Sequence, residues 1–438
     1  MLQQKIKAFS LCLSAVLCVT ACASDKQLPQ GKRISVLEQA TVIKPDVANA
    51  GSVIKIAAPI NMSSWLQKDV NAQHTVPNIK VGTEFKKQWK SDFGKGKSKR
   101  ELLMAKPLIL KNKVFALDAA GKLSAFRLED GELLWQVKLI SDNDNIDDTS
   151  LKGVGLAAEN DVLFVTTGFG VVVAVKAKDG SKVWENNLKS PLRIAPTVAA
   201  DKVFVQSVDN KFFALDAKSG EILWDYDIAM ENTTIVGGAS AAYSPELDMV
   251  ITGFSNGELQ AFSAGYGAPL WTDDLVANHQ AYSSTLLHTI KASPVVEGET
   301  VYALGTAKVF AAINARNGSR VWEKEIGGMS TPVLCGNTLF AVTQDNELVA
   351  VNKANGDVLW ATPIELFGKA SDVQVYAPIM LDNRLVISLS NGVVQTYDAL
   401  SGKKINKIEL DEKLNSEPIA ANGYIVFVTA NAKIIAYK

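Results

Sequence analysis

Two loops contain residue types that bind phosphate or metal ions, and each departs from the pattern that its chemistry needs. Gly96-Lys97-Ser98 has the end of a phosphate-binding loop, but Ser91 replaces the first glycine of that motif and a strand pattern follows instead of a helix. Asp142–Asp148 is rich in Ca²⁺-binding oxygens. A calcium loop of the helix–loop–helix type, however, needs glycine and glutamate where Asp147 and Gly153 stand. We therefore expect two solvated loops and no metal site.

Histidine and cysteine are too sparse for most catalytic or metal chemistry. His74, His279 and His288 lie far apart, and none has a companion at the spacing of metal ligands. Two of the four cysteines lie in the first 20 residues, and Cys335 lies in an apolar stretch. We expect Cys335 to be buried and inert, with a reactive thiol as the alternative.

The N-terminus has the features of a secretory leader. Lys5 and Lys7 precede a mostly apolar run, Ala8 to Val19, that is shorter than the roughly 20 residues needed to span a bilayer. The run ends in Val19-Thr20-Ala21-Cys22, which resembles the lipobox of bacterial lipoproteins. The alternative is an ordinary signal peptide that is cleaved nearby, with Cys22 incidental.

The lipobox resemblance implies an address as well as a modification. In that class the leader, here residues 1–21, is removed, and the cysteine, here Cys22, is lipidated and acylated with palmitate-type chains. Ala23 stands where the signal for inner-membrane retention would be aspartate, so the resemblance implies the outer membrane. Several acyl chains on one cysteine would anchor the protein far more firmly than a single chain.

The overall composition excludes several classes of protein. Hydrophobic residues make up 47% of the chain and charged residues 21%, as in ordinary globular proteins, which excludes collagen and wholesale disorder. The 45 basic and 46 acidic residues give a net charge of −1. Because proteins that wrap a nucleic acid carry a basic excess, we expect no nucleic-acid partner.

The strongest signal is an internal repeat. Glycine recurs at intervals of 40 to 50 residues, and a tryptophan usually follows it four positions later, which is typical of a propeller or solenoid. A small residue, usually alanine, stands six positions before each glycine. The glycine and its partner are Gly131/Trp135, Gly180/Trp184, Gly220/Trp224, Gly267/Trp271, Gly318/Trp322, Gly356/Trp360 and Gly402/Asn406. We expect each tryptophan to pack on the neighbouring unit, against the alanine.

Each repeat reads as four short antiparallel strands. In one unit they are Ile194–Val198, Val203–Val205, Phe212–Asp216 and a strand that starts at Ile222–Trp224. Eight innermost strands are expected near Met104, Gly153, Ile194, Ile235, Lys291, Met329, Val375 and Asn415. The last unit lacks its fourth strand, and Phe85–Trp89 is available to complete it. The sequence therefore predicts an all-β, eight-bladed propeller whose ring is closed by its N-terminal strand, which removes exposed sheet edges.

Three regions follow from this division of the chain. They are a leader of residues 1–21, a lipidated tether of residues 22–81 and the propeller of residues 82–438. The tether contains several prolines and few strand patterns, and we expect Gly31–Leu37 and Asn61–Trp65 to dock on the ring.

The repeat resembles that of quinoprotein dehydrogenases, the PQQ-like repeat, most clearly at Ala214–Trp224. Together with the lipobox, the whole chain resembles the BamB family, the propeller lipoproteins of the outer-membrane β-barrel assembly (BAM) complex. The resemblance implies a non-enzymatic scaffold without a cofactor, with its ring in the periplasm. It would bind the POTRA domains of BamA beside other BAM lipoproteins, contact unfolded outer-membrane proteins and assist their insertion.

The same resemblance points to two loops for the BamA contact. In the first, Leu192 and Arg193 occupy the places of the family's leucine–arginine pair, while Ser190 replaces a further leucine. In the second, Thr289 and Lys291 stand where the family has two aspartates, so one acid is lost and one charge is reversed. We take Leu192 and Arg193 as the candidate contact and leave the second loop open.

Two other functions stay open from the sequence. A PQQ-dependent periplasmic dehydrogenase would share the repeat, but it needs a Ca²⁺ ion, a catalytic aspartate and often adjacent cysteines, and no adjacent cysteine pair occurs here. A propeller lipoprotein that binds a glycan or peptide in its central channel is the other alternative. Fold alone does not decide among these functions.

Overall fold

The computed structural model describes residues 43–46, 53–82, 85–99, 101–139, 152–229, 236–276 and 288–438. The predicted leader, the lipidation site Cys22, the Gly31–Leu37 segment and the acidic loop Asp142–Asp148 lie outside these residues. Within the described part, no helix is long and apolar enough to cross a membrane.

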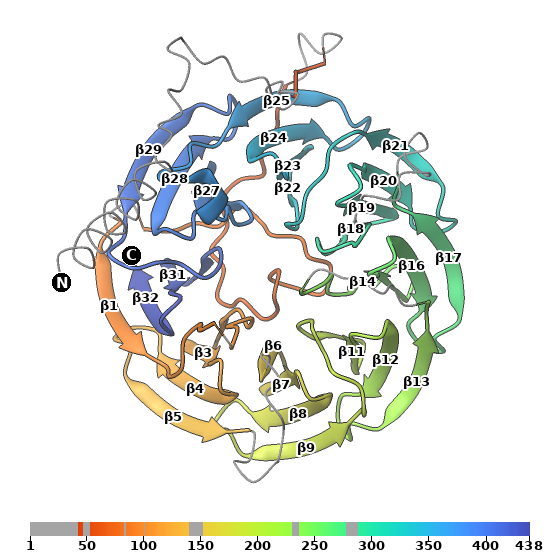
Figure 1. The fold of residues 1–438 in the computed structure, drawn as a ribbon, viewed down its shortest axis with the longest axis vertical. Helices are drawn as coiled ribbons and strands as arrows, with labels where there is room; N and C mark the ends of the chain where they lie inside the picture. Colours follow the sequence, from red (N-terminus) through yellow and green to blue (C-terminus); the bar gives the residue numbers. More distant parts are fainter. Residues whose placement is uncertain are drawn as a thin grey trace, which may run out of the picture. The chain divides into compact units, whose positions relative to one another are not determined.

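Strands of the described residues form eight four-stranded antiparallel sheets, arranged as blades around a centre (Figure 1). The predicted eight-bladed propeller is therefore confirmed. Blade 1 consists of β2 (Leu108–Leu110), β3 (Lys113–Leu117), β4 (Lys122–Arg127) and β5 (Leu133–Lys138), and blade 2 of β6 (Gly153–Glu159), β7 (Val162–Thr167), β8 (Val171–Lys176) and β9 (Lys182–Asn187). Blade 3 consists of β10 (Thr197–Ala199), β11 (Lys202–Gln206), β12 (Lys211–Asp216) and β13 (Ile222–Asp227), and blade 4 of β14 (Ala242–Ser244), β15 (Met249–Gly253), β16 (Glu258–Ser263) and β17 (Pro269–Asp274).

The second half of the ring repeats this plan. Blade 5 consists of β18 (Val295–Glu297), β19 (Thr300–Leu304), β20 (Phe310–Asn314) and β21 (Arg320–Lys324), and blade 6 of β22 (Val333–Cys335), β23 (Thr338–Val342), β24 (Glu347–Asn352) and β25 (Val358–Pro363). Blade 7 consists of β26 (Ile379–Leu381), β27 (Arg384–Ser388), β28 (Val393–Asp398) and β29 (Lys404–Glu409), and blade 8 of β30 (Ile419–Ala421), β31 (Tyr424–Val428), β32 (Lys433–Tyr437) and β1 (Lys87–Asp92). A 3₁₀ turn, η3 (Ala370–Asp372), precedes blade 7. Most innermost strands begin three to seven residues later than the sequence suggested.

The ring closes as predicted, because β1 pairs antiparallel with β32 in the sheet of blade 8. The ring of Phe85 stacks on Tyr437 at 4.4 Å between centroids, and the backbones of Lys86 and Lys438 exchange two hydrogen bonds of 3.0 Å. Strands from the two ends of the propeller thus share one sheet, which leaves the ring without a gap at this blade.

The glycine–tryptophan repeat builds the contacts between blades. Each repeat tryptophan lies on the glycine of the next blade, so closely that a Cβ on that glycine would meet the indole at 2.9 Å or less. The indole N–H donates to a backbone carbonyl of that next blade, for example from Trp224 to Ala264 at 3.1 Å. The other six donors are Trp89, Trp135, Trp184, Trp271, Trp322 and Trp360. The repeat glycines also have positive φ, which favours glycine.

The predicted partner of each tryptophan needs one correction. The repeat alanine does not lie in the neighbouring blade; it is the cross-strand partner of the tryptophan within its own blade, as in Ala214 opposite Trp224. The small side chain leaves the indole free to face outward onto the next glycine. At Asn406 the tryptophan is missing, and here the next blade has no glycine turn, because its outer strand β1 comes from the other end of the propeller.

Residues 53–82, which we call the strap, cross the centre of the ring (Figure 1, orange). The sequence suggested local contacts, whereas the strap bonds to every one of the eight blades. The bonded pairs, in blade order, are Trp65–Ile109, Leu66–Ala158, Gln67–Val198, Ala72–Tyr243, Gln73–Val296, Lys55–Asn337, Ile79–Met380 and Met62–Asn422.

The strap occupies one side of the ring. Its bonds go to the innermost strands and to the turns that join first and second strands, such as the turn at Asn337. We call that side the turn face. The opposite side, the connection face, carries the links between blades and the turns between second and third strands. The strap thus closes the centre from the turn face.

Candidate binding site at the centre of the ring

A pocket of about 460 Å³ lies at the ring centre on the connection face. Its walls come mainly from the links that precede the innermost strands, with Arg193 before β10, Lys291 before β18 and Glu417 before β30. The strap contributes Lys68 to its lining. Because the strap lies across the other side, the pocket is a blind hollow with a charged floor.

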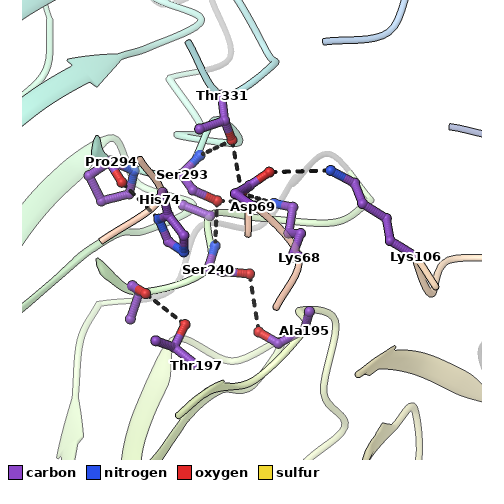
Figure 2. Close-up of polar contacts among 12 residues, drawn as sticks. Lys68, Asp69, His74, Lys106, Ala195, Thr197, Ser240, Ser293, Pro294 and Thr331 are labelled. Atoms are coloured by element: carbon purple, nitrogen blue, oxygen red, sulfur yellow. Dashed lines mark hydrogen bonds and ion pairs between the residues drawn. The ribbon is translucent and has the colours of Figure 1, made fainter. Parts of the chain in front are cut away.

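A buried carboxylate of the strap organises this floor (Figure 2). Asp69 is 4% exposed and lies 3.3 Å from the ammonium of Lys106, which also pairs with Glu417. The hydroxyl of Thr331 donates to Asp69 at 3.1 Å, and Lys68 lies 3.9 Å from the same carboxylate. Asp69 therefore connects the strap directly to the links of blades 1 and 6, and Lys106 extends the connection to Glu417 of blade 8.

The charges of this cluster support one another. Burial alone would raise the pKa of the Asp69 carboxyl, but Lys106 and Lys68 outweigh it and hold the pKa well below its usual range. Burial alone would lower the pKa of Lys106, and the two carboxylates raise it above its usual value instead. Burial lowers the pKa of Lys68, with Asp69 offsetting only part of that effect.

A second set of bonds continues from Lys68 to blades 3, 4 and 5. The Lys68 ammonium donates to the Ser293 hydroxyl at 3.1 Å, and that oxygen accepts the backbone N–H of Ser240 at 3.2 Å. The Ser240 hydroxyl donates to the carbonyl of Ala195 at 3.1 Å. His74 Nδ1 lies 2.8 Å from the carbonyl of Pro294, so Nδ1 carries the proton. Burial lowers the pKa of His74, which favours the neutral ring.

The structure separates the two residues predicted to contact a partner. Leu192 is fully buried in the core between blades 2 and 3 and forms a bridge with Ser207. Arg193 is half-buried and lines the central pocket, and burial lowers the pKa of its guanidinium. Leu192 therefore anchors the loop from inside, and Arg193 is the member of the pair that is open to solvent.

The two residues of the second loop, Thr289 and Lys291, also differ in where their side chains lie. Thr289 is 2% exposed, and its hydroxyl donates to the carbonyl of Ser255 at 3.1 Å. Lys291 projects into the pocket wall beside Gly237. Lys97 of the phosphate-loop-like segment also lines the pocket, at its exposed edge. The spacing of these lysines in the sequence does not predict that they meet, because only the ring brings them together.

Two further segments with reactive residue types are structural. Gly253-Phe254-Ser255-Asn256-Gly257 has the spacing of a hydrolase nucleophile elbow, but it forms the hairpin between β15 and β16 rather than a strand-to-helix turn. The Ser255 hydroxyl donates to Asn210 at 2.9 Å. Cys335 is 2% exposed and burial raises the pKa of its thiol, in line with the expected inert role.

Comparison with known proteins points to one family. The model of the family described as "Outer membrane protein assembly factor BamB" matches residues 147–362. Over these residues the chain matches the BamB family. It is 26% identical over 226 residues to BamB of Shewanella oneidensis, which covers 50% of this chain and 56% of that protein. The chain thus spans little more than half the length of the first curated relatives that it matches.

Solved structures support the fold of this chain. BamB from Moraxella catarrhalis superposes with a TM-score of 0.65 at 19% identity, covering 80% of this chain and 99% of that one. The quinohemoprotein alcohol dehydrogenase from Comamonas testosteroni superposes with a TM-score of 0.64 at 12% identity, covering 85% of this chain and 80% of the enzyme. At these identities both matches concern the propeller fold alone.

The described residues at the ring centre offer no free carboxylate for the Ca²⁺ ion that accompanies a quinone cofactor. Ca²⁺ is held by carboxylate and carbonyl oxygens. Glu417 is the one carboxylate among the described residues that line the pocket, and it is paired with Lys106, as is Asp69 beneath it. No group of three or more histidine, cysteine, aspartate or glutamate side chains is placed to hold a metal ion in the part of the chain that the structure describes.

Proposed function

We propose that this BamB-family protein is a non-enzymatic scaffold of outer-membrane protein assembly. Its lipidated Cys22 would hold it at the outer membrane, with the propeller in the periplasm. The ring would bind the POTRA domains of BamA, beside the other lipoproteins of that complex, and so assist the folding and insertion of outer-membrane proteins. The observation that carries this proposal is the family match over blades 2 to 6, residues 147–362.

Arg193 is the side chain we propose for the BamA contact. It stands at the connection face, its loop is anchored by the buried Leu192, and arginine is a frequent anchor of protein interfaces. Because Leu192 is inaccessible, we assign it the role of positioning the loop. A large or polar substitution at Leu192 would therefore disturb the blade before it disturbed a contact.

Arg193→Glu is expected to weaken binding to the purified periplasmic domain of BamA at least about tenfold, because an interface anchor is replaced by the opposite charge. Lys218→Glu makes the same change of charge in the turn between β12 and β13, on the turn face, and is expected to bind within about twofold of the wild type. Surface plasmon resonance measures both affinities, and circular dichroism checks that both rings are folded. Equal affinity of the Arg193→Glu variant and the wild type would remove Arg193 from the interface.

A further inference from the structure

Among the described residues, basic side chains outnumber acidic ones in the lining of the central pocket. The basic ones are Lys68, Lys97, Lys106, Arg193 and Lys291, and the acidic one is Glu417. Glu417 and the neighbouring Asp69 are both paired with Lys106. Asp69 also lies 3.9 Å from Lys68, so among the described residues at the pocket two carboxylates face five basic groups.

Lys291 is the clearest case. It is partly buried in the wall of the pocket, and it makes no ion pair or hydrogen bond with any of the residues that the structure describes. Burial lowers the pKa of its ammonium, and no carboxylate in the described part of the chain counters that effect. Removing a cation from water without a partner costs free energy, so such a lysine is typical of a site that is completed by a ligand.

The floor of the pocket already shows how an oxyanion is held there. The carboxylate of Asp69 accepts a hydrogen bond from Thr331 and lies between two ammonium groups, at 3.3 Å from Lys106 and 3.9 Å from Lys68. Above this floor, Lys291 and Arg193 line the same hollow, and apolar side chains such as Met104 and Ile194 complete its wall. A volume of about 460 Å³ is within the usual range for small-ligand sites.

We propose that this pocket binds a small ligand with more than one phosphate-type charge. Several cations that converge on one hollow match a multivalent oxyanion better than a single carboxylate. The ligand is either a soluble phosphate compound or the phosphorylated head group of a lipid, since both carry the same chemistry. Lys291 contacts the anion directly, and Lys68 attracts it from the floor. This site shares Arg193 with the proposed BamA contact, but the argument for it rests on Lys291 and the charged floor.

Isothermal titration of the purified full chain with inorganic pyrophosphate tests the soluble source. We expect saturable one-to-one binding that weakens as salt is raised, because charge pairs are screened. Lys291→Gln is expected to weaken it at least about tenfold. Lys218→Gln removes an equal charge from an exposed turn, where the side chain is 82% exposed, and is expected to leave the affinity within about twofold.

Flotation with vesicles of phosphatidylglycerol and phosphatidylcholine tests the lipid source. The protein without its leader and with Cys22 replaced by serine is used, so that no acyl anchor holds it to the vesicle. Binding that needs phosphatidylglycerol and is lost in Lys291→Gln but kept in Lys218→Gln assigns a lipid head group. Two results would overturn the proposal: no binding of either probe, or an equal loss in both variants, which would show a general effect of charge.

Discussion

Asp69→Ala is expected to lower the free energy of unfolding by about 3 kcal/mol, the low end of the range for breaking a buried ion pair. The substitution leaves the partly buried Lys68 without its carboxylate and removes the acceptor of Thr331. Glu417 still pairs with Lys106, which limits the loss. Urea unfolding followed by circular dichroism measures the change.

Two matched variants separate the charge of Asp69 from its hydrogen bond. Asp69→Asn keeps an oxygen for Thr331 but removes the charge, so it should lie between the wild type and Asp69→Ala. Asp161→Ala breaks the exposed pair with Lys111 and should cost no more than about 1 kcal/mol. If Asp69→Ala were as stable as Asp161→Ala, the strap would not be fixed by this cluster.

The stability of the strap should also depend on pH. The pKa of Asp69 is lower in the folded chain than in the unfolded chain. Ionised Asp69 therefore contributes its full stabilisation of the folded state at every pH above the unfolded pKa. This contribution is lost progressively as the pH falls below about 4, where the aspartate of the unfolded chain takes up its proton. The wild type should therefore lose more stability than Asp69→Asn between pH 5 and pH 3, as the same urea titrations would show. Parallel curves would contradict the assignment.

Trp271→Ala is expected to destabilise the ring by about 3 to 5 kcal/mol, the usual cost of deleting a large buried side chain. The Trp271 indole is 8% exposed, lies on Gly318 of the next blade and donates to the carbonyl of Ala315 at 2.6 Å. Neither blade can fill the space, because the glycine turn has no side chain. Differential scanning calorimetry would show the loss as a large decrease in Tm.

Leu270→Ala is the control on the same strand. Its side chain is 48% exposed at the outer rim, so the substitution should change the free energy of unfolding by no more than about 0.5 kcal/mol. Similar losses of stability in the two variants would mean that Trp271 stabilises only its own strand and not the packing between blades.

The fold could be predicted from the sequence because its determinants are local and repeated. In each copy of the repeat the glycine precedes the tryptophan position by four residues, as Gly220 precedes Trp224. Turns such as Asp209-Asn210 separate the strands. Asn406 stands where a tryptophan is expected, and this fits the topology. The next blade takes its outer strand, β1, from the other end of the propeller and so has no glycine turn to be covered. The direction of the tryptophan was harder to predict, since the alanine and glycine that surround it come from different blades.

The centre of the ring could not be predicted in the same way. Lys68, Asp69 and Lys106 meet Thr331 and Glu417 only because eight blades converge on one axis, and sequence separations of 262 and 311 residues carry no local pattern. Leu192 and Arg193 are neighbours in the chain, yet one side chain turns into the core and the other toward the pocket. No repeat period shows which of two adjacent residues faces outward at a loop.

Co-purification from cell envelopes tests the central claim most directly. The full-length lipidated protein is isolated in mild detergent beside its Arg193→Glu and Lys218→Glu variants, and the proteins that accompany each are identified by mass spectrometry. We predict that the wild type and Lys218→Glu recover a large barrel protein with POTRA repeats and small lipoproteins, and that Arg193→Glu recovers much less. Recovery of the wild-type protein alone, under conditions that keep the assembly complex intact, would contradict a role as its scaffold.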